Sequence, residues 1–167
     1  MSVYTWNGMS SSLNPSIDRV RKAERIAEAE VRVFRADQHL DCCHDLVDGH
    51  QAVLKAYGIK KLTTFNRDWI GDPSVIVIAA VAKGAGVDGK TERVLGGARM
   101  HGVDDIQNMP LIKAVGEQDV NLAQHMQTYA DEGAFELGGV WNSIELAGMG
   151  VEATFLIQAA MATLTMV

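Results

Sequence analysis

Two adjacent glycines interrupt a segment that otherwise reads as a β-strand, residues 134–142. Glycine weakens a strand, so Gly138 and Gly139 predict a β-bulge or a close approach of the backbone to a ligand. A bulge would splay this strand from its neighbour and leave backbone N–H groups available to bind. A bulge with a purely structural role is the alternative.

A glycine-rich turn over residues 145–150 follows, and a helix is expected over residues 151–167. The unpaired N–H groups at the start of a helix and the positive end of its dipole attract anions. Gly148 and Gly150 would let a phosphate approach the backbone closely. The segment therefore predicts a phosphate site, with an ordinary strand-to-helix turn as the alternative.

Arg99 and His101 lie in the second half of the strand that is expected beside this one, residues 92–102. Arg99 is suited to hold a carboxylate of an acceptor molecule with both arms of its guanidinium group. His101 would line the same pocket, so we expect both residues to bind substrate. An ion pair of Arg99 with Asp104 or Glu136 is the structural alternative.

The pattern of apolar residues predicts one α/β domain over residues 15–167, preceded by a flexible N-terminus over residues 1–14. Its expected fold is a central mixed, mostly antiparallel sheet with flanking helices. Residues 74–82 are almost continuously apolar and rich in β-branched side chains, which indicates a strand covered on both faces. The other expected elements are a helix at 16–30, a strand at 31–35, a one-sided helix at 38–57, a loop at 83–90 and a mostly helical insertion at 105–131.

Composition excludes several classes of protein. The net charge of −6 argues against a nucleic-acid surface, which usually gathers Lys and Arg. Cys42 and Cys43 are adjacent and indicate no disulfide framework. They stand at helical spacing from His39, but no second Cys/His pair accompanies them, so we expect no metal site. Neither a signal peptide nor an apolar run of the ~20 residues that span a bilayer is evident, so we expect a cytoplasmic protein.

With Gly148-Met149-Gly150 and this order of elements, residues 31–167 resemble the GNAT superfamily, the Gcn5-related N-acyltransferases. In that family a splayed strand leads into a pyrophosphate loop of the form Gln/Arg-x-x-Gly-x-Gly/Ala and then a helix. The insertion at 105–131 resembles the larger members, such as N-acyl amino acid synthases and acyl-homoserine lactone synthases. The end of the family fold is absent, and the apolar last helix has no stop signal. We therefore expect the chain to continue past Val167, or a second chain to complete the sheet.

The resemblance implies an N-acyltransferase that moves an acyl group from an acyl-CoA or acyl-carrier-protein thioester to an amine, amino acids included. Glu136 would match the glutamate that deprotonates the amine, and a partly dry cleft would raise its pKa toward that of a base. The backbone N–H of Val140 would bind the thioester carbonyl. The residues implied to hold the cofactor are Val140, Trp141, Asn142, Ser143, Ala147, Gly148, Met149, Gly150 and Val151.

One residue departs from the family pattern. Glu145 stands where the pyrophosphate loop has Gln or Arg. A carboxylate beside a pyrophosphate is unfavourable unless it turns away or pairs with a cation. The alternative function is therefore a non-catalytic module that binds an acyl thioester or mediates dimerisation, as a homodimer or with a second chain.

Overall fold

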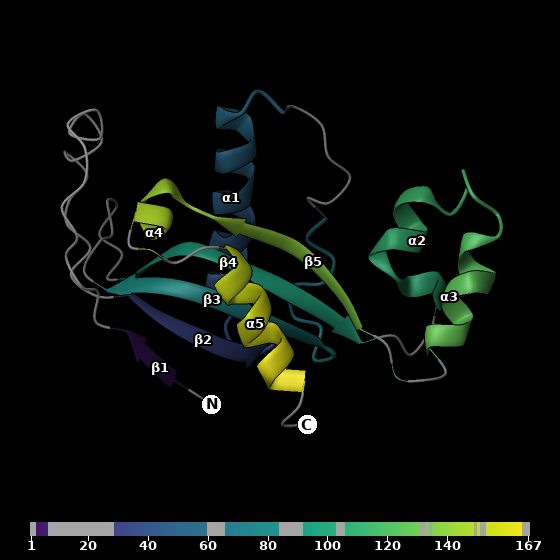
Figure 1. Cartoon of the computed structure of the whole chain (residues 1–167), viewed down its shortest axis with the longest axis horizontal. Helices are drawn as coiled ribbons and strands as arrows, with labels where there is room; N and C mark the ends of the chain where they lie inside the picture. Colours follow the sequence, from purple (N-terminus) through teal and green to yellow (C-terminus); the bar gives the residue numbers. More distant parts are fainter. Residues whose placement is uncertain are drawn as a thin grey trace.

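The computed structural model describes residues 3–6, 29–59, 66–83, 92–102, 106–130, 133, 135–148, 150 and 153–164. Its centre is a sheet in the strand order β1-β2-β3-β4-β5, and every pair of neighbours in it is antiparallel (Figure 1). The strands are β1 Val3–Trp6, β2 Ala29–Arg35, β3 Val75–Lys83, β4 Glu92–Gly102 and β5 Phe135–Asn142. The predicted α/β fold with a mostly antiparallel sheet is confirmed. The parallel pair that a mixed sheet would add is not found among the described strands.

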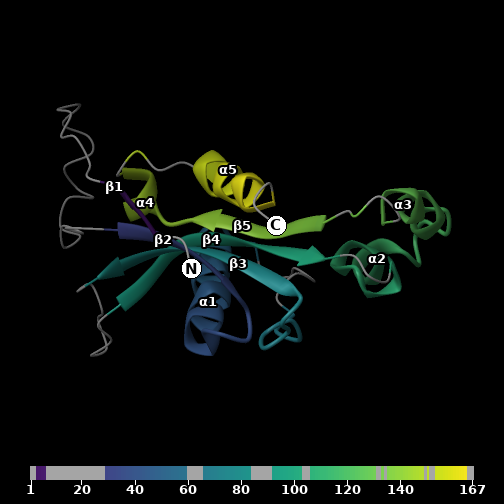
Figure 2. The same ribbon diagram turned by 90° about the horizontal axis from the view of Figure 1, so that it is seen from below.

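Helices cover both faces of this sheet. Helix α1 (Leu40–Ala56) packs on one face, and α4 (Ile144–Gly148) and α5 (Ala153–Leu164) lie on the other (Figure 2). Strand β3 runs through the middle and contributes alternate residues to the two cores. This confirms the prediction that its continuous apolar stretch is covered on both sides. No helix among the described residues is long and apolar enough to cross a membrane.

The one-sided pattern of α1 places its apolar stripe on the sheet. Cys43, Leu46 and Val47 are buried there, and the Cys43 thiol donates to the carbonyl oxygen of Ala36 at 3.6 Å. Cys43 is therefore a core residue, as its place in the stripe predicts. The helix begins at Leu40 and ends at Ala56, inside the range expected for it.

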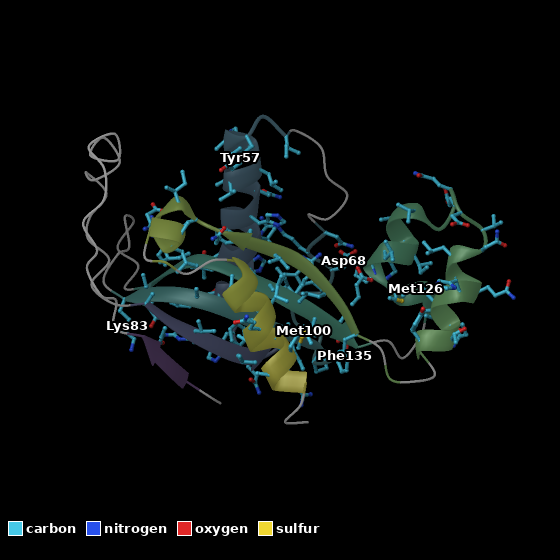
Figure 3. All side chains as sticks on the ribbon, in the orientation of Figure 1. Tyr57, Asp68, Lys83, Met100, Met126 and Phe135 are labelled. Carbon is cyan, nitrogen blue, oxygen red and sulfur yellow. The ribbon has the colours of Figure 1, made fainter. Side chains whose placement is uncertain are left out.

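The insertion between β4 and β5 is helical, as predicted. It consists of the short 3-10 helix η3 (Ile106–Asn108), α2 (Pro110–Val115) and α3 (Leu122–Ala130). Its apolar residues form a separate small core, in which Met126 lies between the helices (Figure 3). The insertion extends beyond the ends of β4 and β5 (Figure 1), so it adds a wall at that end of the sheet.

Some expected boundaries differ from the structure. Residues 145–150 are not a simple turn, because α4 occupies Ile144–Gly148. The hydroxyl of Ser143 accepts the Leu146 N–H at 3.1 Å and thus caps this short helix. Glu30 belongs to β2 rather than to a helix, and Val3–Trp6 pairs with β2 although residues 1–14 were expected to be flexible. Residues 7–28 and 84–90 lie outside the described part of the chain.

Gly97 allows α1 to pack directly on β4. A Cβ at this position would overlap the carbonyl oxygen of Ile78 and would lie 2.5 Å from Cδ1 of Leu46. Gly102 lies on the same strand, but the nearest atom to a Cβ there is a side-chain carbon of Phe135 at 3.7 Å, an ordinary contact. A methyl group would therefore overlap neighbouring atoms at Gly97, whereas it would fit at Gly102.

Replacing Gly97 by Ala should lower the free energy of unfolding by about 1–3 kcal/mol, because the backbone of β3 cannot move aside for the methyl group. Gly102→Ala is the matched control on the same strand and should change it by less than about 0.5 kcal/mol. Urea unfolding of both variants measures the difference. Equal stabilities for the two variants would contradict the close packing described above.

Candidate functional site

A cavity of about 700 Å³ lies on the α1 side of the sheet, between the ends of β4 and β5, the loop before β3 and helix α2. Arg99, His101 and Glu136, which the sequence analysis singled out separately, all line it. The remaining lining residues are Asn66, Asp68, Trp69, Asp72, Ser74, Gly102, Met109, Pro110, Leu111, Lys113, Ala114, Gly138 and Gly139. Asp68 lies between the sheet and the helical insertion (Figure 3).

Strand β5 carries the predicted bulge at the edge of this cavity. Gly97 pairs with Trp141 and Arg99 pairs with Gly138, which leaves Ala98 opposite both Gly139 and Val140. Gly139 has a φ of +61°, a conformation that favours glycine. The bulge is confirmed, and β5 remains paired with β4 on both sides of it.

Arg99 is a buried cation, with only 6% of its surface exposed. Its guanidinium carbon lies 5.1 Å from the centre of the Trp69 ring, and its Nε donates to Nε2 of His101 at 3.0 Å. Burial lowers the pKa of Arg99, and the charge of Glu136 opposes that shift. An arginine remains charged in such surroundings, so the cavity contains a fixed positive charge.

The glycine pair of β5 lies against the side chain of Arg99. A Cβ at Gly139 would lie 3.4 Å from Nη1 of Arg99, and one at Gly138 would lie 3.9 Å from its Nε. Both distances are ordinary van der Waals contacts, so these contacts do not by themselves require glycine. The positive φ of Gly139 gives that residue a structural role in the bulge, in line with the structural alternative.

His101 is held as a neutral imidazole. Burial and the nearby charge of Arg99 lower its pKa to about 4. Because its Nε2 accepts the hydrogen bond from Arg99, its proton belongs on Nδ1. His101 therefore orients Arg99 and supplies a neutral N–H donor.

Glu136 faces His101 across the β4–β5 pair and is half-buried. Its Oε2 accepts the backbone N–H of Leu111 at 3.0 Å. Helix α2 has no side-chain cap of its own at Met109, so Glu136 serves as its cap from another strand. Burial raises the pKa of Glu136, while the Leu111 hydrogen bond and the charge of Arg99 lower it less strongly. The raised pKa agrees in direction with the expectation for a base.

The loop before β3 is fixed to α1 and carries the other wall of the cavity. Arg67 pairs with Asp48 and lies 3.0 Å from Nδ1 of His44. Asp72 accepts hydrogen bonds from both the N–H and the hydroxyl of Ser74, at 2.8 and 2.7 Å. These contacts position Trp69 beneath the guanidinium of Arg99. Sequence reasoning does not identify Lys113, which lines the cavity from α2.

The side chains expected near the thioester have structural partners. Trp141 is 6% exposed and points toward α1, where a Cβ on Gly49 would lie 2.6 Å from its Cζ2. Its indole therefore belongs to the core, and only its backbone can face a ligand. Asn142 pairs with Gly96 at the end of β5, and the hydroxyl of Ser143 caps α4.

Two N–H groups of the expected phosphate turn already have acceptors. Ala147 donates to the carbonyl of Ser143 and Gly150 donates to that of Ala147, each at 3.0 Å. Gly148 is open, since a Cβ there would find no atom within 4 Å. Met149 and Val151 lie outside the described residues.

Glu145 has a cationic neighbour. Its Oε1 lies 3.6 Å from Nη1 of Arg93 on β4. Pairing with a cation is one of the two conditions under which a carboxylate is tolerable at a pyrophosphate turn. The positive charge of Arg93 therefore compensates for the negative charge that Glu145 would place beside a pyrophosphate.

Comparison of this chain with protein-family models, with curated proteins and with solved structures finds no match in any of the three. The described residues also contain no group of three or more His, Cys, Asp or Glu side chains arranged to hold a metal ion. The cavity and the residues around it are therefore the features from which a function can be inferred.

Removing the Glu136 carboxylate should uncap α2. In Glu136→Ala, the amide of Leu111 should exchange its hydrogen about 5-fold faster, since a helix cap contributes about 1 kcal/mol. Glu136→Gln keeps an oxygen that can accept the bond and is the matched control, with little change expected. Hydrogen exchange followed by NMR measures this, and unchanged exchange in Glu136→Ala would disprove the cap.

His101 should make the protein sensitive to acid. Its pKa is about 4 in the fold and about 6.5 in the unfolded chain, so its contribution is present above pH 6.5 and lost as the pH falls toward 4. Wild type should lose up to about 3 kcal/mol more stability than His101→Gln over this range. Urea unfolding at pH 7.5 and 4.5 tests it, and parallel losses in the two proteins would exclude a buried neutral His101.

Proposed function

We propose that this chain is a GNAT-like N-acyltransferase that moves an acyl group from an acyl-CoA or acyl-carrier-protein thioester to an amine. The observation that carries the proposal is the position of Glu136. Its carboxylate lines a cavity beside the bulge of β5, and burial raises its pKa. The order of the described elements, with β2, α1, the β3–β4 pair and then β5, supports the resemblance on which the proposal is based.

The proposed reaction is direct attack of the amine on the thioester. Glu136 accepts a proton from the amine, whose nitrogen then forms a bond to the carbonyl carbon. The carbonyl oxygen gains negative charge, which the backbone N–H of Val140 stabilises. The C–S bond then breaks, and the thiolate leaves and takes up a proton. Glu136 can act while it caps α2, because the cap uses Oε2 and the proton can go to Oε1.

The donor would lie along the outer side of β5 and the turn that follows. Its pantetheine arm would run beside residues 140–143, and its pyrophosphate would lie at residues 147–151. The open backbone at Gly148 and the Arg93–Glu145 pair favour this placement. The two N–H groups that already have acceptors in the turn would weaken phosphate binding unless the turn opens. A carrier protein, which binds through a larger surface, would depend less on this turn.

The acceptor would enter from the cavity. Arg99 offers a buried positive charge oriented by His101, which suits an acceptor that carries a carboxylate as well as its amine. The amine would then lie toward Glu136, the negative group of the same cavity. An amino acid meets both requirements.

The second candidate is a non-catalytic module that binds an acyl thioester or assembles with another chain. It is favoured by the outer position of β5 in the described sheet and by the exposure of Phe135 and Leu137 along that strand. An edge strand of this kind can pair with a second chain. Cytoplasmic location remains an expectation under both candidates.

Acyl transfer to a set of amino acids, measured by release of free thiol, tests the enzyme. Glu136→Gln should lower the rate ~100-fold or more if Glu136 is the base. Asp68→Asn changes a carboxylate of the same cavity and should stay within a few-fold of wild type. A Glu136→Gln rate close to wild type would remove Glu136 from this role. Absence of turnover with every donor would favour the non-catalytic module.

A further inference from the structure

The large cavity contains a second cation, which the proposed reaction does not use. Lys113 lines the cavity from α2, whereas Arg99 lines it from β4. The charges of both residues lower the pKa of His101, so both act on the same part of the cavity. None of the ion pairs among the described residues includes Lys113. Its ammonium group can therefore pair with a negative charge that a ligand brings.

The acidic residues of the loop before β3 also line this cavity, but they hold the loop together. Asp68 accepts a hydrogen bond from the side-chain amide of Asn66 at 2.6 Å. Asp72 accepts two hydrogen bonds from Ser74. A basic ligand would have to share both carboxylates with the bonds that fold the loop. Glu136 is the half-buried carboxylate of the cavity, and its Oε1 is not used by the cap of α2.

The charges of three lining residues define what the cavity can pair with. Arg99 and Lys113 contribute two positive charges, and Glu136 contributes one negative charge. An α-amino acid with a carboxylate in its side chain has the reverse set, two negative charges and one positive. A neutral amino acid would leave Lys113 without a partner, and a basic one would bring a like charge toward it. Complementary charges of this kind favour one ligand class over another.

We propose that the acceptor bound by this cavity is an α-amino acid with a second carboxylate in its side chain, such as aspartate or glutamate. Its α-carboxylate pairs with Arg99, its amine lies toward Glu136, and its side-chain carboxylate pairs with Lys113. This inference rests on the proposed acyl transfer and narrows the class of acceptor.

The helical insertion then selects the acceptor. The N–H of Leu111 donates to Glu136 at 3.0 Å, and Lys113 follows two positions later on the same helix. The cap therefore fixes the part of α2 that carries Lys113 relative to the carboxylate that receives the amine. The amine and the second carboxylate of the ligand are recognised by groups that this one contact holds together.

Calorimetric titration with free amino acids tests the inference without requiring turnover. Two matched pairs, L-glutamate with L-glutamine and L-aspartate with L-asparagine, differ in side-chain charge at nearly constant shape. Wild type should bind the acid about 5-fold tighter than the amide in at least one pair, the effect expected for one ion pair at an exposed lysine.

Two lysine variants assign this preference to the cavity. Lys113→Met should abolish the preference and leave the affinity for the amide within about 2-fold of wild type, since only the second carboxylate loses its partner. Lys55→Met is the matched control, because Lys55 is an exposed lysine of α1 outside the cavity and its loss changes the net charge equally. This control should keep the preference.

The results separate this inference from the proposed function. Equal binding of acid and amide in both pairs, tighter binding of L-lysine, or a preference that survives in Lys113→Met would overturn the inference and leave acyl transfer to other amines open. Failure to bind any of these amino acids would overturn it as well. Selective binding of the acid without thiol release from any thioester donor would instead contradict the acyltransferase and leave the cavity as a binding site for acidic amino acids.

Discussion

The burial of the Arg99 guanidinium group constrains the structure around the cavity at the ends of β4 and β5. Arg99 lies on β4 with 6% of its surface exposed, and a buried charge is costly unless other groups compensate for lost water. The ring of Trp69 lies against it, the neutral His101 accepts from its Nε, and the charge of Glu136 favours its protonated form. The backbone of β5 lies against the guanidinium at its bulge, where Gly139 has a positive φ that favours glycine.

The same constraint explains how distant parts of the chain form one cavity. Strand β4 is fixed from both sides, by α1 through Gly97 and by the α5 core through Leu95. Its far end therefore presents Arg99 and His101 in a defined place. Glu136 then joins β5 to α2 by capping that helix, which sets the helical insertion as the facing wall. A residue expected to perform chemistry thus also holds the site together.

The sequence predicts the elements better than it predicts the contacts between them. The apolar stretch of β3 and the glycines of β5 carry local signals, and the buried strand and the bulge are confirmed. The cap of α2 by Glu136 joins residues that are 25 positions apart, and no local pattern marks it. The direction of Trp141 depends on Gly49, a glycine within α1 whose effect appears only when helix and strand are packed. The family resemblance, the thioester donor and the roles of Glu136 and Val140 stay predictions.

Calorimetric titration of the purified protein with coenzyme A, acetyl-CoA and a long-chain acyl-CoA tests the proposed thioester donor most directly. We expect binding on the order of micromolar affinity that strengthens with acyl length, because the acyl chain would bury apolar surface on binding. Binding should weaken when Gly148, where the backbone is open, is replaced by Asp. A folded protein that binds none of the three would contradict a coenzyme A donor and leave the turn after β5 as a structural cap.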